Sequence, residues 1–334
     1  MHLLITLAAC VVTSFVFTHI VERFGLSRVV GWIPAGIVLG SPYLKDVLLE
    51  PNTHLVIKVG EAGFLALMFM AGMEISWSML YKEKKDAFFV ASFAAAAPLL
   101  LGFVIFYALG FPALTALTVG ICMSITAEAT KAKELMDMKK LETRVGSLMM
   151  SAGVLDDIVG MSLFVTIVYL STGAFVAGEH LILLLGILAF LTGVFIHAFI
   201  GRHHPHISHL ENVLLHMLIP FFFITIGINF SLNFVVLHPL ILPAVVITGI
   251  AGKILGTLLT KPFITDLNYR QLYLIGWAMN SRGAVELAIA FVAFNLGLLN
   301  EELYSSLIIM ALITTMIFPL VMRRMFKEDP SIMN

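Results

Sequence analysis

Two adjacent aspartates, Asp156 and Asp157, interrupt a strongly apolar stretch between residues 153 and 160. Neighbouring carboxylates repel each other, and burial disfavours the charged form of each. A fold that keeps such a pair out of water therefore needs a positive partner for it. Protons and hard cations such as Na+ both bind carboxylate oxygen, so they compete for one site. If that site opens to one side of a membrane at a time, the competition exchanges a cation for protons without covalent chemistry.

Other ionisable residues also lie in apolar stretches: Glu61, Glu128, Lys253, Arg282 and Glu286. A charge at the centre of a bilayer costs about 2.5–3.5 kcal/mol even on lenient insertion scales, so such residues are expected to face a partner or an ion pathway. Arg282 and Glu286 are four residues apart, and for them we favour a structural ion pair. For the two aspartates we favour ion binding, because two like charges do not stabilise each other.

The composition indicates where these charges lie. Of the 334 residues, 60% are hydrophobic and 12% are charged, and the mean hydropathy is +1.00. A soluble domain carries about 25% charged residues, so the sequence predicts an all-α polytopic membrane protein. The net charge of -1 indicates no nucleic-acid partner. We find no Ser-His-acid constellation or phosphate-binding loop, and Cys10 and Cys122 lack metal-ligand spacing. We therefore expect neither an enzyme nor a bound cofactor.

Apolar runs of roughly 20 residues, the length that crosses a bilayer, indicate about eleven transmembrane helices. The first is expected to be a retained helix, because no Lys or Arg precedes it and no small-residue cleavage site follows it. The expected spans are 2–20, 28–42, 54–74, 87–109, 112–132, 144–171, 180–200, 210–230, 234–260, 270–297 and 302–322.

Positive charges outside these spans fall almost entirely on one side. Of the 20 Lys and Arg residues, Lys45 lies alone on one side and 16, Lys131 among them, are assigned to the other, while Lys58, Lys253 and Arg282 fall inside spans. Cytoplasmic loops carry the excess of positive charge. The sequence therefore predicts a multi-pass protein of the inner (cytoplasmic) membrane, with its N-terminus outside and its C-terminus in the cytoplasm.

Polar residues interrupt two of the spans, at residues 120–130 and 276–284. Each interruption starts with glycine and continues with Met and a small polar residue, Ser124 in the first and Asn280 in the second. Paired interruptions of this kind point to a midplane binding site. We predict a single transporter unit, 1–334, with a first repeat at about 1–172, a second at about 180–323 and a short cytoplasmic tail at 324–334.

Taken in order along the chain, these motifs resemble the monovalent cation/proton antiporter superfamily, in its bacterial sodium/proton exchanger branch. The resemblance covers about 300 residues and includes glycine-rich helices, the aspartate pair, a basic helix and two unwound helices. The matching segments are residues 31–42, 60–63, 69–74, Thr126, Asp156-Asp157, 220–227, 252–256 and 280–283.

The resemblance implies a role for each residue of the site. Asp157 would bind Na+ and the proton, and Thr126 would complete the Na+ site. Asp156 would pair with Lys253 and exchange that ion pair for a proton, which resembles the electrogenic members of the family. The family also implies inverted repeats with two crossing discontinuous helices, a core domain that moves against a dimerisation domain, and a homodimer working by alternating access.

Two departures from the family pattern affect these expectations. Where the family has an acidic or hydroxyl residue after Thr126, this chain has Ala127 followed by Glu128. We hypothesise that Glu128 supplies the missing oxygen; the alternative is that it pairs with Lys131 or Lys253. In addition, the chain between Ser171 and residue 189 is short by about two helices, which preserves the orientation of the later spans.

Several other functions agree with the same residues. A K+/H+ antiporter or K+ efflux protein is the nearest alternative to Na+ or Li+ exchange. A Na+-coupled carrier of organic anions and a non-transporting membrane scaffold are more distant. A group of histidines, for which we favour a solvated loop over a pH sensor, comprises His203, His204, His206 and His209.

Overall fold

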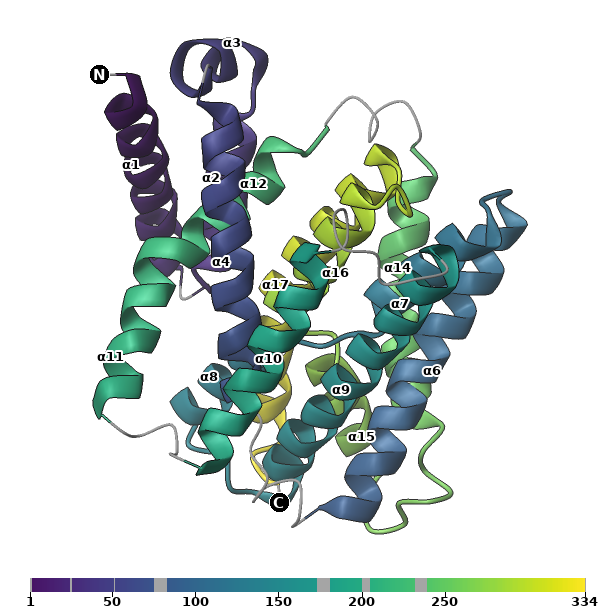
Figure 1. Cartoon of the computed structure of the whole chain (residues 1–334). Coiled ribbons are helices and arrows are strands. Elements are labelled where there is room, and N and C mark those ends of the chain that lie inside the picture. The colour runs from purple at the N-terminus through teal and green to yellow at the C-terminus, as the bar shows by residue number, and fades with distance from the viewer. Residues whose placement is uncertain are drawn as a thin grey trace. The chain divides into compact units, whose positions relative to one another are not determined.

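The computed structural model describes residues 2–24, 26–50, 52–74, 83–172, 181–199, 205–231 and 239–333, and every regular element in these ranges is a helix (Figure 1). Eight of the described helices are long and apolar enough to cross a membrane, and three shorter apolar helices accompany them. The all-helical membrane fold predicted from the sequence is therefore confirmed. Every expected span overlaps a helix, while the number of crossings stays a prediction.

The long apolar helices begin and end close to the expected boundaries. Five of them are α1 (His2–Arg23), α4 (Thr53–Met73), α6 (Lys84–Ala108), α9 (Arg144–Thr172) and α10 (Leu181–Phe199). The others are α14 (Ile241–Leu258), α17 (Glu301–Glu328) and a continuous stretch made of α11 (Pro205–Val213), the π-helix η2 (Leu214–Leu218) and α12 (Ile219–Ile228). Because α17 continues to Glu328, the helix includes part of the segment that we expected to be a tail.

Shorter helices make up the rest of the described chain. The apolar ones are α2 (Val29–Leu39), α7 (Ala113–Ser124) and α16 (Ala284–Asn295). The remainder are α3 (Pro42–Leu44), the π-helix η1 (Lys45–Leu49), α8 (Glu128–Asp137) and α15 (Tyr269–Ala278). Both predicted interruptions are present, because α7 and α8 divide one expected span and α15 and α16 divide another.

The chain forms two compact units, each made of two separate segments. Unit 1 comprises residues 1–75 and 176–231, and unit 2 comprises 76–175 and 232–334. These units describe packing rather than sequence symmetry, so the expected division into two repeats stays a prediction. The short connection from 173 to 180 lies outside the described residues.

Unit 1 is built by helices that approach each other at glycines. A Cβ at Gly72 of α4 would overlap the carbonyl oxygen of Phe190 in α10, and a Cβ at Gly193 of α10 would overlap the carbonyl oxygen of Phe69 in α4. Small residues let membrane helices pack backbone to backbone. The segment 69–74, which contributed to the family resemblance, is therefore a packing surface in this unit.

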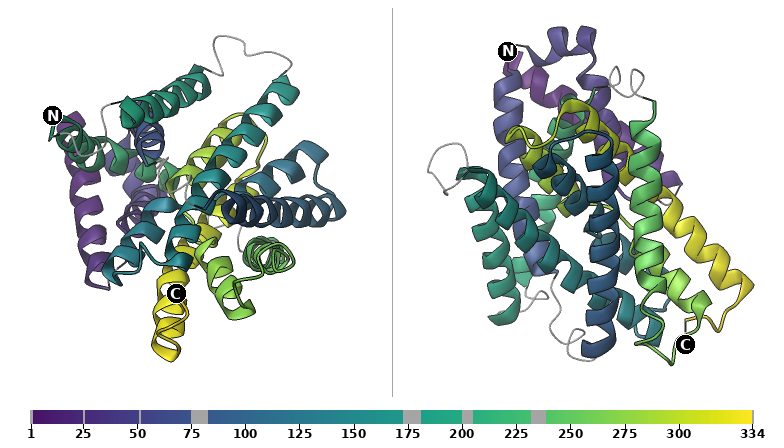
Figure 2. Two further views of the ribbon diagram at one scale, coloured as in Figure 1. Left: turned by 90° about the horizontal axis from the view of Figure 1, so that it is seen from below. Right: turned by 90° about the vertical axis from the view of Figure 1, so that its right-hand side faces the viewer.

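Unit 2 places α14 against α6 in the same way. A Cβ at Gly252 would lie 2.6 Å from the Cα of Pro98, and one at Gly256 would overlap the carbonyl oxygen of Phe93. Figure 2 shows α17, in yellow, beside α14, in green, within the same unit. Lys253 follows Gly252 directly, so the close approach of α6 and α14 fixes the position of that lysine along α6.

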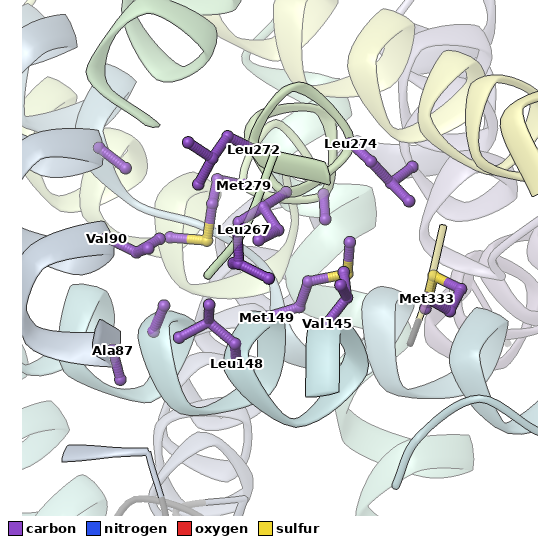
Figure 3. Close-up of a cluster of buried hydrophobic side chains, with 14 of the residues drawn as sticks. Ala87, Val90, Val145, Leu148, Met149, Leu267, Leu272, Leu274, Met279 and Met333 are labelled. Carbon is purple, nitrogen blue, oxygen red and sulfur yellow. The ribbon is translucent and has the colours of Figure 1, made fainter. Parts of the chain in front are cut away.

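A buried apolar cluster surrounds the first turns of α9, and we call it the Met149 cluster. Figure 3 shows Val145, Met149 and Met333 within it. Met333 is fully buried, and its carbonyl oxygen accepts a hydrogen bond from the backbone N–H of Val145 at 3.3 Å. Residues that follow α17 therefore fold back and complete the core at the base of the aspartate helix.

Charges tie the same end of α9 to its neighbours. The guanidinium of Arg144, the first residue of α9, donates to Glu83 and Asp86 near the start of α6. It also donates to Asp266, in the segment before α15, at 3.1 Å. These partly exposed pairs each add little stability, but together they connect three elements of unit 2 at one point.

We expect Gly256→Val to destabilise the packing of α14 on α6, because the added side chain would meet the backbone of Phe93. Overpacking of this kind costs about 1–3 kcal/mol. Thermal unfolding of the detergent-solubilised protein measures the effect. Leu255→Ala, on the half-exposed face of the same helix, is the matched control and should unfold close to the wild-type temperature. Equal unfolding temperatures for Gly256→Val and wild type would contradict the packing described here.

We expect Met333→Ser to lower the unfolding temperature as well, because it removes a buried side chain from the Met149 cluster. Full burial of a Met side chain contributes about 1.5–3 kcal/mol. Lys327→Ala, on an exposed position of α17, controls for general effects near the chain end. A variant that unfolds like wild type would show that the end of the chain does not support the core.

Candidate functional site

The first interruption leaves the backbone of α7 open at its carboxyl end. Helix α7 ends at Ser124, residues 125–127 are non-helical, and α8 begins at Glu128. The last carbonyls of a helix have no partner within the helix, and they carry a partial negative charge. The first N–H groups of α8 carry the opposite partial charge. The break therefore creates two charged helix ends that the protein itself must satisfy.

The second interruption lies directly against the first. Between α15 and α16, the carbonyl oxygen of Ser281 accepts a hydrogen bond from the N–H of Ala127 at 2.7 Å. The hydroxyl of Ser281 donates to the carbonyl oxygen of Ala127 at 2.8 Å. The hydroxyl of Thr126 lies 3.0 Å from the carbonyl oxygen of Met279. Two segments about 150 residues apart thus bond to each other through their broken backbones.

Two basic side chains bind the carboxyl end of α7. Lys253, from α14, donates to the carbonyl oxygen of Ser124. Arg282, from the second interruption, donates to the carbonyl oxygens of Ile125 at 2.6 Å and Cys122 at 3.3 Å. Both side chains are fully buried. Positive charge at the carboxyl end of a helix is favourable, so these residues stabilise the break.

Asp156 completes the surroundings of Lys253. Its Oδ2 lies 2.7 Å from the Lys253 ammonium and 2.5 Å from the Thr126 hydroxyl. The ammonium also lies 2.9 Å from the Thr126 hydroxyl oxygen. Within the described part of the chain, Oδ1 of Asp156 has no hydrogen-bond partner. The pairing of Asp156 with Lys253, which the family resemblance implied, is present in the structure.

Asp157 leaves α9 in a different direction from Asp156. Successive residues of an α-helix are about 100° apart around its axis. Asp156 is 0% exposed, whereas Asp157 keeps 8% of its surface exposed. Thr126, which we expected to share a cation with Asp157, bonds to Asp156 in this conformation. The two aspartates therefore differ in environment: Asp156 is fully buried and paired with Lys253, whereas Asp157 is buried slightly less completely.

Glu128 forms an ion pair with Lys131, which is one of the two pairings that the sequence left open as an alternative to binding a cation. Its Oε1 lies 2.7 Å from the ammonium of Lys131, and both side chains are buried. We counted Lys131 among the positive charges of the cytoplasmic side; the structure shows that the residue is 0% exposed, and its side of the membrane stays a prediction. The spacing of three residues between an acid and a base at the start of a helix was the available signal.

Arg282 and Glu286 lie near each other but are not tightly bonded. The Nε of Arg282 is 3.8 Å from Oε2 of Glu286, and both side chains are buried. Most of the hydrogen bonds of Arg282 go to backbone carbonyls. Glu286 lies in the first turn of α16, where a negative charge is favourable. The structural role that we favoured for the two residues stays a prediction.

The remaining candidates act at helix ends. The hydroxyl of Ser124 donates to the carbonyl oxygen of Ile121 at 2.8 Å, so Ser124 meets Lys253 through its backbone rather than its side chain. Asn280 donates to the carbonyl oxygens of Gly276 at 3.0 Å and Ile250 at 3.2 Å, which fastens the end of α15 to α14.

Glu61 and the histidine group are not among the contacts described above. Glu61 belongs to unit 1, on α4. Of the histidine group, His203 and His204 lie outside the described residues, and His209 is exposed on α11.

The arrangement can hold a positive charge without water. A carboxylate, a hydroxyl and a backbone carbonyl surround the Lys253 ammonium. Oxygen ligands of these three kinds suit hard metal cations as well. The donor set therefore fits a monovalent cation, provided that the lysine moves aside.

Known proteins are similar to this chain along most of its length. The profile of the family described as "Sodium/hydrogen exchanger, transmembrane" matches residues 9–215 and 187–328. The Na(+)/H(+)-K(+) antiporter GerN of Bacillus cereus is 25% identical, over 91% of this chain and 91% of that protein. A Na(+)/H(+) antiporter of Enterococcus hirae is 24% identical, over 96% of this chain and 97% of that protein.

A solved structure shares the fold. The sodium proton antiporter MjNhaP1 from Methanocaldococcus jannaschii superimposes with a TM-score of 0.67, covering 98% of both chains at 13% sequence identity. The family profile covers most of the chain and includes both interruptions and the aspartate pair. The protein therefore belongs to the sodium/hydrogen exchanger family of multi-pass membrane cation/proton antiporters.

Proposed function

We propose that this protein exchanges Na+ or Li+ for protons electrogenically, by alternating access to a site formed by Asp156, Asp157, Thr126 and Lys253. The observation that carries the proposal is the buried Asp156–Lys253 ion pair at the junction of two broken helices. A buried ion pair contributes little net stability. Its position beside a second buried carboxylate, Asp157, is instead what a site for competing cations needs.

The exchange follows from competition among charges. Asp157 holds either a proton or the metal cation, because two positive charges on one buried carboxylate repel each other. The cation approaches Asp156 and Thr126 as well, and the Lys253 ammonium must then leave its oxygen ligands. The Lys253 ammonium releases a second proton when the pair opens to admit the cation, and it takes up a proton again when the cation leaves and the pair re-forms. Two protons then cross for each cation, so the cycle moves net charge.

The names of the relatives support this choice of ions. The Enterococcus hirae relative is named a Na(+)/H(+) antiporter. The Bacillus cereus relative is named a Na(+)/H(+)-K(+) antiporter, which makes K+/H+ exchange the second candidate. The same experiment separates the two, because Na+, Li+ and K+ can be added in turn to identical vesicles.

The expected setting of this activity is the inner membrane, with the N-terminus outside and the C-terminus in the cytoplasm. We propose a homodimer in which unit 2, which contains the site, is the moving core and unit 1 is the dimerisation domain. The chain's own side chains carry the exchange, and the proposal requires no organic cofactor.

Asp157→Asn should abolish cation-driven proton flux, because the amide binds neither the proton nor the metal cation as a carboxylate does. The assay uses proteoliposomes with an internal pH dye and additions of Na+, Li+ or K+. Asp46→Asn, at an exposed acid of unit 1, should retain the flux. Flux in the Asp157→Asn vesicles at the wild-type level would remove the proposed mechanism.

The double variant Asp156→Asn/Lys253→Met should exchange ions without net charge movement, because only Asp157 still carries a proton. Removing both partners avoids an unpaired buried charge, which on its own costs about 3–5 kcal/mol. Na+-driven proton flux is measured with and without an imposed membrane potential. The wild-type rate should follow the potential and the variant rate should not. A variant rate that still depends on the potential would contradict the role given to Lys253.

A further inference from the structure

Unit 2 contains a second fully buried ion pair that the exchange cycle does not use. Lys131 and Glu128 face each other across 2.7 Å, with side-chain exposures of 0% and 4%. They occupy the first turn of α8, directly after the interruption that contains Thr126. The pair is therefore only a few residues from the proposed cation site, without being part of it.

The ammonium of Lys131 touches three elements of the site at once. It forms the ion pair with Glu128 in its own helix. It donates to the carbonyl oxygen of Met149 in α9 at 3.0 Å. It also lies 3.8 Å from the sulfur of Met279, in the second interruption. The carbonyl oxygen of that same Met279 lies within hydrogen-bond distance of Thr126.

Helix α9 has a notch that fits this pair. A Cβ at Gly153 would overlap Oε1 of Glu128 and the ammonium of Lys131. Gly153 precedes Asp156 and Asp157 by three and four residues, which places it one helical turn away. The ion pair thus packs against α9 one helical turn before the aspartates, where only glycine leaves room for it.

Stability alone does not explain such a pair. Replacing a buried ion pair by well-packed apolar residues is often neutral or stabilising. What the pair does supply is directional bonding between α8, α9 and the second interruption. Thr126 lies two residues before Glu128, and its 2.5 Å contact with Asp156 depends on where α8 begins.

We propose that Glu128 and Lys131 are positioning residues, which lock the start of α8 onto α9 so that Thr126 stays within reach of the aspartate carboxylates. The inference rests on the proposed cation site. It differs from our sequence-based hypothesis that Glu128 is itself a cation ligand. As a ligand, Glu128 would act without Lys131. As a positioning pair, the two residues act together.

The test uses the double variant Glu128→Gln/Lys131→Met, which removes both charges and leaves none unpaired. We expect it to fold, with an unfolding temperature near that of wild type. Its apparent KM for Na+ should rise roughly ten- to hundredfold, the usual effect of losing the residues that orient metal ligands, while the maximal rate changes much less.

A matched control exists on the same helix. Glu134 of α8 forms a two-point ion pair with Arg323 of α17, at 2.5 and 2.9 Å. Glu134→Gln/Arg323→Met removes this pair, which ties α8 to α17. We expect a change in unfolding temperature at most, with the KM for Na+ unchanged. This control shows whether the loss of any ion pair on α8 raises the KM for Na+, or only the loss of the pair that positions Thr126.

The outcomes are distinguishable. A folded Glu128→Gln/Lys131→Met variant with the wild-type KM, or a KM shift no larger than in the control, overturns the positioning role. A KM raised by Glu128→Gln but not by Lys131→Met identifies Glu128 as a direct ligand instead, and also overturns it. Wild-type protein that shows neither cation-driven flux nor stabilisation by Na+ against thermal unfolding contradicts the proposed function, and with it the inference.

Discussion

Helix backbone that breaks inside a membrane must be satisfied by the protein, because lipid offers no hydrogen bonds. This constraint organises unit 2. The carboxyl end of α7 is bound by Lys253 and Arg282, and the two interruptions bond to each other through Ala127 and Ser281. The buried acids Glu128 and Glu286 occupy the first turns of α8 and α16, where the helix dipole favours negative charge.

The same constraint links structure to transport. Lys253 stabilises the broken end of α7 and also neutralises Asp156, so any cation that displaces the lysine disturbs the break as well. In the proposed cycle, binding and conformation are coupled in this way, because a ligand shifts an equilibrium only as far as it binds one state better than the other. Asp157 is the next residue of α9 after Asp156, and in the proposed cycle it binds the exchanged ion.

Positioning depends on close backbone contacts as much as on charges. Gly252 and Gly256 set the distance between α14 and α6, and Gly153 makes room on α9 for Glu128 and Lys131. Several of the glycine-rich segments that resemble the family are therefore packing surfaces. Within unit 2, Gly252 and Gly256 fix the position of Lys253 along α6, and Gly153 fixes where α8 starts on α9, since interiors packed without gaps transmit small shifts.

The sequence by itself determined the membrane fold, the two interrupted helices and the aspartate pair. Hydropathy over roughly 20 residues and polar residues within apolar runs are local signals, which can be recognised directly in the sequence. The partners of the charges were harder to predict. Lys253 was matched to Asp156 through family resemblance, whereas the burial of Lys131 was missed.

Only the tertiary structure decided that Thr126 bonds to Asp156, that Lys131 spans three elements and that Met333 returns to the base of α9. It also showed that each compact unit joins two distant segments of the chain. These contacts depend on which sides of neighbouring helices are in contact and on how closely glycines let those helices approach each other. Residue types in sequence do not specify that geometry, because the same charge is solvated on one helix face and buried on the next.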